Sequence, residues 1–226
     1  MRIATWNINS VRLRLPLLLK LLAEEGPDIV CLQETKIHHR CGKEDCRHIA
    51  AAVPDGRGGR VELHNLYIPA GGDVPDPAVN DKFAHKLAFL DELTAWFPAL
   101  RRADQPMILV GDLNIAPLEH DVWSHKQLLD VVSHTPVEVE KLTALQHSLG
   151  WVDAVRHFVP ADRKLYSWWS YRAADWSASD KGRRLDHVWV TPPLAGNLAA
   201  ARILRDARGW EPKPSDHVAV LVDLAP

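Results

Sequence analysis

Short apolar runs bordered by an acid, an amide or a histidine recur along this chain. A run of four to eight apolar residues is typical of a buried strand. A polar side chain at the end of such a strand is held rigidly at the rim of the core. Five such places spread over the chain indicate strand ends that converge on one site. Asn7, Glu34, Asp112 and Asn114 follow apolar runs, whereas Asp186, Asp216 and His217 precede them.

The N-terminal pattern predicts a strand, a helix and a second strand. Residues 2–8 read as the first strand and residues 28–33 as the second. Between them, leucines recur at helical spacing over residues 11–25, and a Gly-Pro pair ends the helix. These leucines are Leu15, Leu18, Leu19 and Leu22.

Strands and helices alternate over the rest of the chain. Residues 54–59 are rich in turn formers and predict a hairpin between two strands. The apolar stripe of the helix at 83–102 predicts core packing and no function of its own. We expect strands at 47–53, 60–68, 106–112, 152–155, 165–171, 185–190, 201–204 and 218–224, helices at 83–102 and 137–149, and a long loop with helical fragments at 117–133.

This order of elements fits an α/β fold in which two packed sheets are flanked by helices. At 226 residues the chain is most simply one domain, 1–226. It has no apolar stretch long enough to span a bilayer and no signal-peptide pattern. Three cysteines argue against a disulfide framework, so we expect a cytoplasmic protein with no membrane contact. The net charge of −2 means that any phosphate-binding surface must be a local patch.

Oxygen ligands at separate strand ends predict a site for a hard metal ion. A single acid at a strand end is usually a solvated cap, so the prediction depends on the whole set. Mg²⁺ prefers octahedral oxygen sites with few protein carboxylates, and it can polarise a phosphoryl oxygen and help a water attack. Gly111 removes a side chain just before Asp112, which should leave room for a ligand. The candidate ligands are Glu34, Asp112, Asn114 and Asp216.

His217 and Asp186 predict a carboxylate–imidazole pair. A carboxylate bonded to one ring nitrogen fixes the tautomer and supports positive charge on the ring. Such a pair can act as a general base or donate a proton to a phosphate oxygen. Tyr67 lies between an apolar strand and the loop 69–72, where its phenol can donate to a phosphate or a leaving oxygen.

The aromatic strip at 167–172 predicts contacts with nucleic acid. An amphipathic strand with one aromatic face in the core accounts for about half of this strip. The rest of the strip fits a stacking wall for a base or deoxyribose, with Arg172 able to reach into a duplex. Candidate phosphate contacts are Lys36, Arg12, Arg14, Lys181, Arg183 and Arg184.

Together these motifs resemble the exonuclease III group of AP endonucleases, in its bacterial form, within the endonuclease/exonuclease/phosphatase superfamily. The resemblance implies a four-layer α/β sandwich: two mixed sheets face to face, helices outside, and the site at one edge. It also implies Mg²⁺- or Mn²⁺-dependent cleavage of duplex DNA at abasic sites and from 3′ ends, and we expect a monomer. The motifs occur in the family's order at 6–9, 32–36, 66–69, 111–114, 184–186 and 215–217.

The resemblance also implies a role for each motif residue. Glu34 resembles the principal metal ligand, Tyr67 a phosphate-contacting tyrosine, and Asp112 the residue that activates or orients the attacking water. Trp168 resembles a wall of the abasic-sugar pocket, and Arg172 a side chain that wedges into the duplex. The full sets are Asn7, Glu34, Asp112, Asn114 and Asp216 for the metal, Tyr67, Asp112, Asn114, Asp186 and His217 for catalysis, and Lys36, Trp168, Arg172 and Arg184 for DNA.

The chain departs from the family between Lys36 and Arg47. The family has several tens more residues there, whereas only residues 37–46 bridge the gap here. We expect one sheet to lack strands, which leaves an unpaired edge or an exposed apolar face. A competing interpretation of this segment is a zinc site. Its ligands would come from His38, His39, Cys41, Cys46 and His48.

Two alternatives to a working nuclease stay open. The missing strands could leave a catalytically impaired or non-catalytic remnant with intact motifs. The superfamily core would also suit a phosphatase that acts on small phosphorylated molecules, although the strip at 167–172 favours a nucleic acid.

Overall fold

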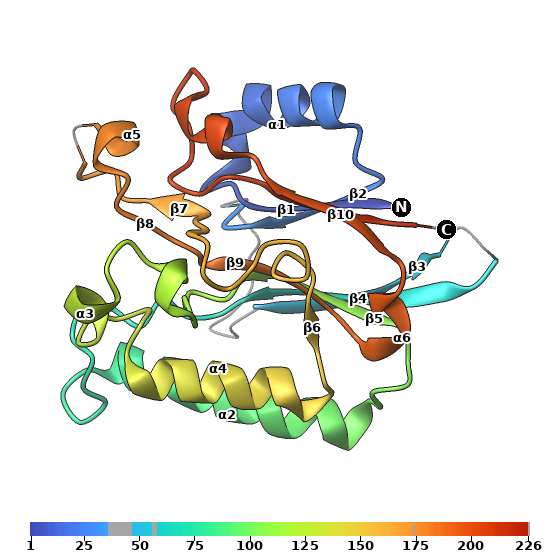
Figure 1. Cartoon of the computed structure of the whole chain (residues 1–226), viewed down its shortest axis with the longest axis horizontal. Coiled ribbons are helices and arrows are strands. Elements are labelled where there is room, and N and C mark those ends of the chain that lie inside the picture. The colour runs from blue at the N-terminus through green and yellow to red at the C-terminus, as the bar shows by residue number, and fades with distance from the viewer. Residues whose placement is uncertain (36–46, 56–57, 174, 226) are drawn as a thin grey trace.

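The fold is a four-layer α/β sandwich, as expected (Figure 1). The computed structural model describes residues 1–35, 47–55, 58–173 and 175–225. Helix α1 (Val11–Glu25) forms one outer layer, and α2 (Asp81–Leu100) and α4 (Pro136–Ser148) form the other. Two mixed sheets lie between them, and the two ends of the chain lie close together at one side of the sandwich.

The strands of the two large sheets come from both halves of the chain. The first sheet has the order β10-β11-β1-β2 and the second has the order β3-β4-β5-β9-β6. The strands of the first are β10 (Leu198–Ile203), β11 (Val220–Leu224), β1 (Arg2–Asn7) and β2 (Ile29–Gln33). Those of the second are β3 (His48–Pro54), β4 (Arg60–Tyr67), β5 (Met107–Asp112), β9 (Asp186–Val190) and β6 (Val152–Asp153).

Short elements carry the chain around the end of the sandwich where β5 stops. Strands β7 and β8 pair with each other as a separate ribbon, so only Trp168 and Trp169 of the expected strand 165–171 are paired. The pattern missed β8 and two short helices, because elements of two to four residues show no periodicity. These elements are β7 (Trp168–Trp169), β8 (Gly182–Arg183), α3 (His125–Leu128), α5 (Trp176–Ser179), and the 3₁₀ turns Glu119–Asp121 and Arg205–Gly209. The short helix α6 (Pro192–Ala195) follows β9 at the other end of the sandwich, where β5 begins.

Apolar cores between the layers hold the sandwich together. The core between the sheets is built largely from β-branched side chains such as Ile108, Val188 and Val222. A second core joins the five-stranded sheet to α2 and α4 through residues such as Phe97 and Leu142. The expected stripe of α2 is buried in full, which confirms its role in core packing. None of the helices in the described part of the chain is both long and apolar enough to cross a bilayer.

Helix α1 is present, but its buried face is not the one that the leucine spacing suggests. Leu17 and Leu21 face the sheet and are almost fully buried. Leu15, Leu19 and Leu22 are each at least 40% exposed. Because leucine or another apolar residue occupies most positions of the helix, on more than one face, the spacing alone does not select the buried face.

Each large sheet ends in a strand that borders the shortened segment, whereas the sequence predicts missing strands in one sheet. Within the described residues, β2 pairs only with β1, and β3 pairs only with β4. Ile49 on β3 is 64% exposed, so part of this edge is an uncovered apolar surface. The shortened segment itself lies outside the described residues, and the absence of strands there stays a prediction.

Candidate active site

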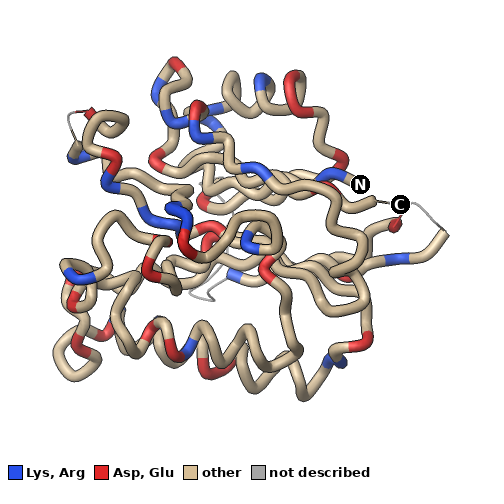
Figure 2. Tube along the Cα trace, in the orientation of Figure 1, with Lys and Arg blue, Asp and Glu red and all other residues tan. Residues whose placement is uncertain are grey.

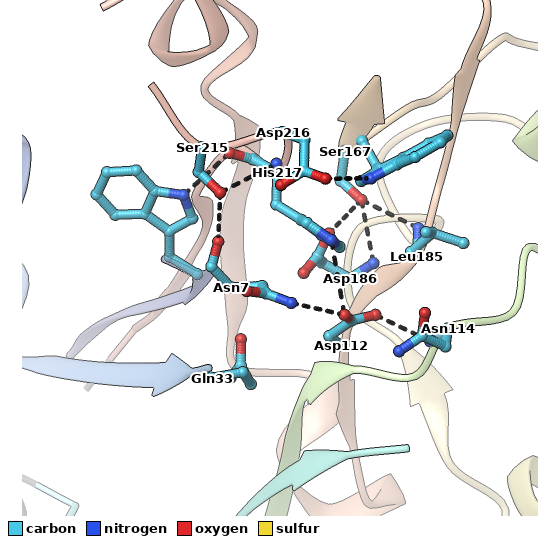
Figure 3. Close-up of polar contacts among 12 residues, drawn as sticks. Asn7, Gln33, Asp112, Asn114, Ser167, Leu185, Asp186, Ser215, Asp216 and His217 are labelled. Atoms are coloured by element: carbon cyan, nitrogen blue, oxygen red, sulfur yellow. Dashed lines mark hydrogen bonds and ion pairs between the residues drawn. The ribbon is translucent and has the colours of Figure 1, made fainter. Parts of the chain in front are cut away.

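Strand ends from both sheets meet at one edge of the sandwich, as the polar pattern predicts. Asn7 ends β1 and Glu34 follows β2, which runs parallel to β1. Asp112 ends β5 and is the direct cross-strand partner of Asp186, the first residue of β9. His217 precedes β11 and points toward both of these acids (Figure 3).

Three polar residues at this edge have a left-handed backbone. Asn9, Glu34 and Asn114 have φ angles of 46°, 49° and 53°. Residues other than glycine rarely adopt this conformation, and when they do it is often at functional sites. Glu34 and Asn114 thereby leave their strands and line the cavity described below.

Asn7 and Tyr67 hold the acids of the site by donating hydrogen bonds. The Asn7 Nδ2 atom donates to Glu34 Oε1 and to Asp112 Oδ2, both at 2.9 Å. The Asn7 Oδ1 atom accepts from the backbone N–H of Asn9. The Tyr67 hydroxyl donates to Glu34 Oε1 at 2.8 Å, and burial together with Glu34 and Asp112 raises the pKa of Tyr67. In this arrangement Asn7 orients two predicted metal ligands.

His217 and Asp186 form the expected buried pair. The His217 Nδ1 atom lies 2.8 Å from Asp186 Oδ2, which also accepts from the Ser167 hydroxyl at 2.6 Å. Ser167 Oγ in turn accepts hydrogen bonds from the backbone N–H groups of Leu185 and Asp186. Burial disfavours a charged imidazole, but the carboxylates of Asp186 and Asp112 outweigh it and raise the pKa of His217 to about 10. The ring is therefore an imidazolium at neutral pH.

Asp112 lies beside the His217 imidazolium and shares the Asn7 amide with Glu34. Its Oδ2 atom is 3.7 Å from His217 Nε2, and its Oδ1 atom accepts the backbone N–H of Asn114 at 3.0 Å. Burial raises the pKa of Asp112 to about 7, and Asp186 adds to this effect while His217 opposes it. A carboxylate poised near neutral pH suits the transfer of a proton from water.

Gly111 is required at its position, but not to admit a ligand. Its φ angle is 140°, and a Cβ atom there would lie 1.9 Å from the carbonyl oxygen of Leu66. The neighbouring strand β4 therefore occupies the space that the sequence suggested was open. The glycine lets β4 and β5 pair closely just before Asp112.

The donor chemistry of the site fits a hard divalent cation. Glu34, Asp112 and Asp216 present carboxylates to the same cavity, and oxygen ligands of this kind are those that Mg²⁺ prefers. Asp112, Asp186 and His217 also place one potential ligand atom each within 4.8 Å of one another, but the imidazolium of His217 is paired with Asp186 and has no free lone pair for a metal ion. The Asn114 Nδ2 atom donates to Ile68 O at 2.9 Å.

A cavity of about 820 Å³ connects these acids to an aromatic and basic wall. Trp168 lines it and donates through Nε1 to Asp216 Oδ2 at 3.0 Å. Arg183 lies over the Trp168 ring at 5.4 Å, and Lys181 lies over the Trp123 ring at 4.6 Å. Arg172 lines the cavity as well, and acidic and basic segments lie close to each other around β7, β8 and the start of β9 (Figure 2).

Arg184 is not a DNA contact, contrary to the prediction from the sequence. It is 1% exposed and forms a buried ion-pair network with Asp121 and Asp153. Arg14 is also buried, and it donates to Asn9 O and Lys213 O. Both cations are committed to the fold, so neither can reach a phosphate.

Part of the predicted set lies outside the described residues. This holds for Lys36 and for most of the zinc candidates, namely His38, His39, Cys41 and Cys46. The remaining zinc candidate, His48, places its Nε2 atom 2.9 Å from His64 Nδ1 and packs beside Trp96. That hydrogen bond occupies one of the two ring nitrogens of His48.

Several residues that orient the site, rather than react, were not predicted from the sequence. Ser167 fixes Asp186, and the Ser215 hydroxyl donates to Asn7 O at 2.8 Å. Trp123 and Ser133 line the cavity from the loop between β5 and α4. Ser167 and Ser215 lie within the segments 167–172 and 215–217, which the sequence marks as functional, but it assigns neither serine a role. Nothing in the pattern of the 117–133 loop marks Trp123.

Comparison with known proteins agrees with this geometry. The chain is 28% identical over 258 aligned positions to an exodeoxyribonuclease of Bacillus subtilis (strain 168), covering 97% of this chain and 98% of the relative. Because 258 exceeds the 226 residues here, that relative has residues that this chain lacks. An exodeoxyribonuclease III of Haemophilus influenzae is 26% identical, with 99% of this chain and 100% of the relative covered.

Solved structures share the fold over the whole chain. A 3′ phosphatase from Neisseria bound to a product DNA hairpin is 27% identical with a TM-score of 0.86, and both chains are covered completely. An AP endonuclease from Archaeoglobus fulgidus is 25% identical with a TM-score of 0.84, and 99% of each chain is covered. The resemblance to the exonuclease III group is thus confirmed. Residues 4–217 match the Endonuclease/Exonuclease/phosphatase family, and the chain belongs to that family.

Proposed function

We propose that this chain is a metal-dependent DNA repair nuclease that hydrolyses phosphodiesters at abasic sites and from the 3′ ends of duplex DNA. One observation carries the proposal. A single cavity is lined by the carboxylates of Glu34, Asp112 and Asp216 and also by Trp168 and Arg183. Acids suited to a metal ion therefore share one cavity with groups suited to a nucleic acid. The names of the relatives, which include exodeoxyribonucleases and an AP endonuclease, support the same activity.

Glu34, Asp112 and Asp216 would hold a Mg²⁺ or Mn²⁺ ion at the acidic side of the cavity. When bound, such an ion supplies neutralisation of phosphate charge and polarisation of a phosphoryl oxygen. The Asn7 amide donates to Glu34 and Asp112 and so keeps both carboxylates turned toward the cavity. Tyr67 donates to Glu34 from the other side.

The remaining residues would manage protons and charge at the phosphate. Asp112 accepts a proton from, or orients, the attacking water, in keeping with its raised pKa. The imidazolium of His217 stabilises negative charge on the phosphoryl oxygens, since Asp186 keeps the ring protonated and oriented. Asn114 lines the cavity next to Asp112 and is the second candidate donor to the phosphate.

The test of this function is cleavage of a duplex that carries one abasic site. We expect the protein to nick this duplex in Mg²⁺, and we expect chelation by EDTA to abolish nicking. An undamaged duplex of the same sequence measures 3′-end degradation in parallel. Hydrolysis of a sugar or inositol phosphate without any activity on DNA would instead support the small-molecule phosphatase. Absence of hydrolysis on all these substrates, from a cooperatively folded protein, would support the remnant.

Two features of the site bear on these alternatives. A remnant would be expected to have a distorted site, whereas Asn7, Glu34, Asp112 and Tyr67 are joined by hydrogen bonds of 2.8–2.9 Å. A site for small molecules does not need the aromatic and basic wall that Trp168 helps to form. Both features favour the nuclease.

Arg183 is the cation that we expect to contribute most to DNA binding. Its Nη1 atom donates to Val132 O and to Ser133 Oγ, which are both neutral, and it lines the cavity, where a phosphate can approach it. Replacement of Arg183 by Gln keeps a donor for this loop but removes the charge. We expect DNA affinity in EDTA to fall about 3–10-fold and the slope of log K against log salt to decrease by about 1.

Fluorescence anisotropy with a labelled duplex at several salt concentrations measures both effects. Arg102 is a matched control because it is 73% exposed, pairs with Asp104 and lies in the loop that precedes β5, at the far end of that strand from the site. Arg102→Gln should change neither affinity nor slope. Equal effects of the two substitutions would show that Arg183 is not a specific phosphate contact.

A further inference from the structure

Lys86 on α2 and Glu138 on α4 form an ion pair that is completely buried. The Lys86 Nζ atom lies 2.5 Å from Glu138 Oε1, and both side chains are 0% exposed. Removing two charges from water is costly, and well-packed apolar residues often replace a buried ion pair without loss of stability. Stability alone is therefore a weak explanation for this pair, and its other contacts are informative.

The lysine reaches from the outer helix layer to two segments of the cavity rim. Its Nζ atom donates to Asn114 O at 2.8 Å and to Ala70 O at 3.3 Å. An ammonium group has three donors, so Glu138 and these two carbonyls account for all of them. Asn114 and Ala70 both line the cavity. Lys86 thus ties α2 to the turn that follows Asp112 and to the loop that follows Tyr67.

The glutamate fixes a third segment of the rim. Its carboxylate accepts the backbone N–H groups of Ser133 and Thr135 and the Thr135 hydroxyl, at 2.7–3.1 Å. Ser133 and Val132 line the cavity and also hold Arg183 through its Nη1 atom. The order of this loop, and with it the position of the Arg183 cation, therefore depends on Glu138.

The three rim segments are packed tightly around the lysine. A Cβ atom added to Gly71 would lie 2.9 Å from Lys86 Cδ and 3.2 Å from Val132 Cγ1. Gly71 has a φ angle of 89°, which favours glycine independently. The loop after β4, the lysine stem and the loop before α4 are thus in direct contact, so displacement of one should displace the others.

We propose that the Lys86–Glu138 pair is a positioning element of the active site. It sets the relative placement of the Asn114 turn, the loop 70–72 and the loop 131–135, and so aligns the catalytic turn with the phosphate-binding wall. Neither residue touches the substrate. The inference rests on the proposed nuclease function for its effect on turnover, but its structural part can be measured without metal or DNA.

The test is the double substitution K86M/E138Q, which removes both charges and preserves side-chain volume. We expect thermal stability close to that of the wild type, because no charge is left buried without a partner. We expect amide hydrogen exchange in residues 112–116 and 131–135 to accelerate more than tenfold, with the centre of α2 unchanged. In Mg²⁺, kcat at an abasic site should fall about 10–100-fold while KM changes less than threefold.

The surface pair between the same two helices is the matched control. Lys141 Nζ lies 2.5 Å from Asp91 Oδ1, and both side chains are at least partly exposed. D91N/K141M removes an ion pair of the same kind that touches no rim segment. It should leave exchange in both segments and kcat unchanged.

Two results would overturn the inference. One is a folded K86M/E138Q protein with wild-type exchange in both segments and wild-type kcat. The other is uniform acceleration of exchange that includes α2, which would indicate general loosening. If the double variant does not fold, E138D is assessed by the same measurements, because it keeps the charge that pairs with Lys86 and shortens only the reach of the carboxylate to Ser133 and Thr135. A wild type that cleaves no DNA would refute the proposed function, whereas the exchange comparison would still decide this inference.

Discussion

Replacing His217 with alanine should lower cleavage at an abasic site by about 10²–10⁴-fold, the range typical for loss of a positioned acid–base group. The imidazolium is the one buried cation that lies against both Asp112 and Asp186 in the described part of the site. Its removal eliminates charge stabilisation at the phosphate and leaves two neighbouring carboxylates without their shared counter-ion. Steady-state nicking assays in Mg²⁺ measure the loss.

The exposed residue His157 provides the control for this substitution. His157→Ala should leave the rate within twofold of the wild type, and circular dichroism should show both variants folded. Unchanged cleavage by a folded His217→Ala protein would contradict the assignment of the His217–Asp186 pair.

The Asp186 carboxylate gives this prediction a pH signature. Asp186 and Asp112 raise the pKa of His217 to about 10, so removal of the Asp186 charge must lower that pKa. In Asp186→Asn the imidazolium should lose its proton at lower pH than in the wild type. The alkaline limb of the pH–rate profile should therefore move to lower pH. If the alkaline limb of the Asp186→Asn profile stays at the wild-type pH, a group other than His217 controls that limb.

Replacing Arg184 with methionine should destabilise the fold by about 3 kcal/mol, since it leaves buried acids without a partner. Arg184 donates through Nε and Nη2 to Asp121 at 2.9 Å and through Nη1 to Asp153 at 2.6 Å. Arg156 also pairs with Asp121 and offsets part of the loss. For a chain of this size, the melting temperature should fall by roughly 6–12 °C.

Arg102 again provides the comparison, because its ion pair with Asp104 is largely exposed. Arg102→Met should change stability by less than about 0.5 kcal/mol. Thermal unfolding followed by circular dichroism distinguishes the two variants. A stable Arg184→Met protein with weakened DNA binding would restore the role in DNA binding that the sequence suggested.

The contrast between Arg183 and Arg184 shows why neighbouring residues could not be assigned from the sequence. Both are arginines directly before the Leu185-Asp186 motif. Successive side chains of an extended strand point to opposite faces, so only one of the two can face the cavity. The pairing of Trp168 with Arg183 turns that residue toward the site and turns Arg184 inward.

Helix α1 and Gly111 illustrate the same limit. The leucine-rich helix was predictable from spacing, but the choice of Leu17 and Leu21 for its buried face depends on how it packs on the first sheet. The glycine before Asp112 was predictable as special, but its purpose depends on the carbonyl of Leu66 in the adjacent strand. In each case the deciding neighbour is distant in sequence.

The amino-acid sequence by itself determined the type of fold and the polar groups of the site, because apolar periodicity and the residues that end each run are local properties. Only the tertiary structure decided which cations reach the cavity, which are buried, and that Lys86 and Glu138 join three rim segments from beneath. The physical reason is that strand order, pleat direction and buried ion pairing arise from contacts between residues far apart in the chain.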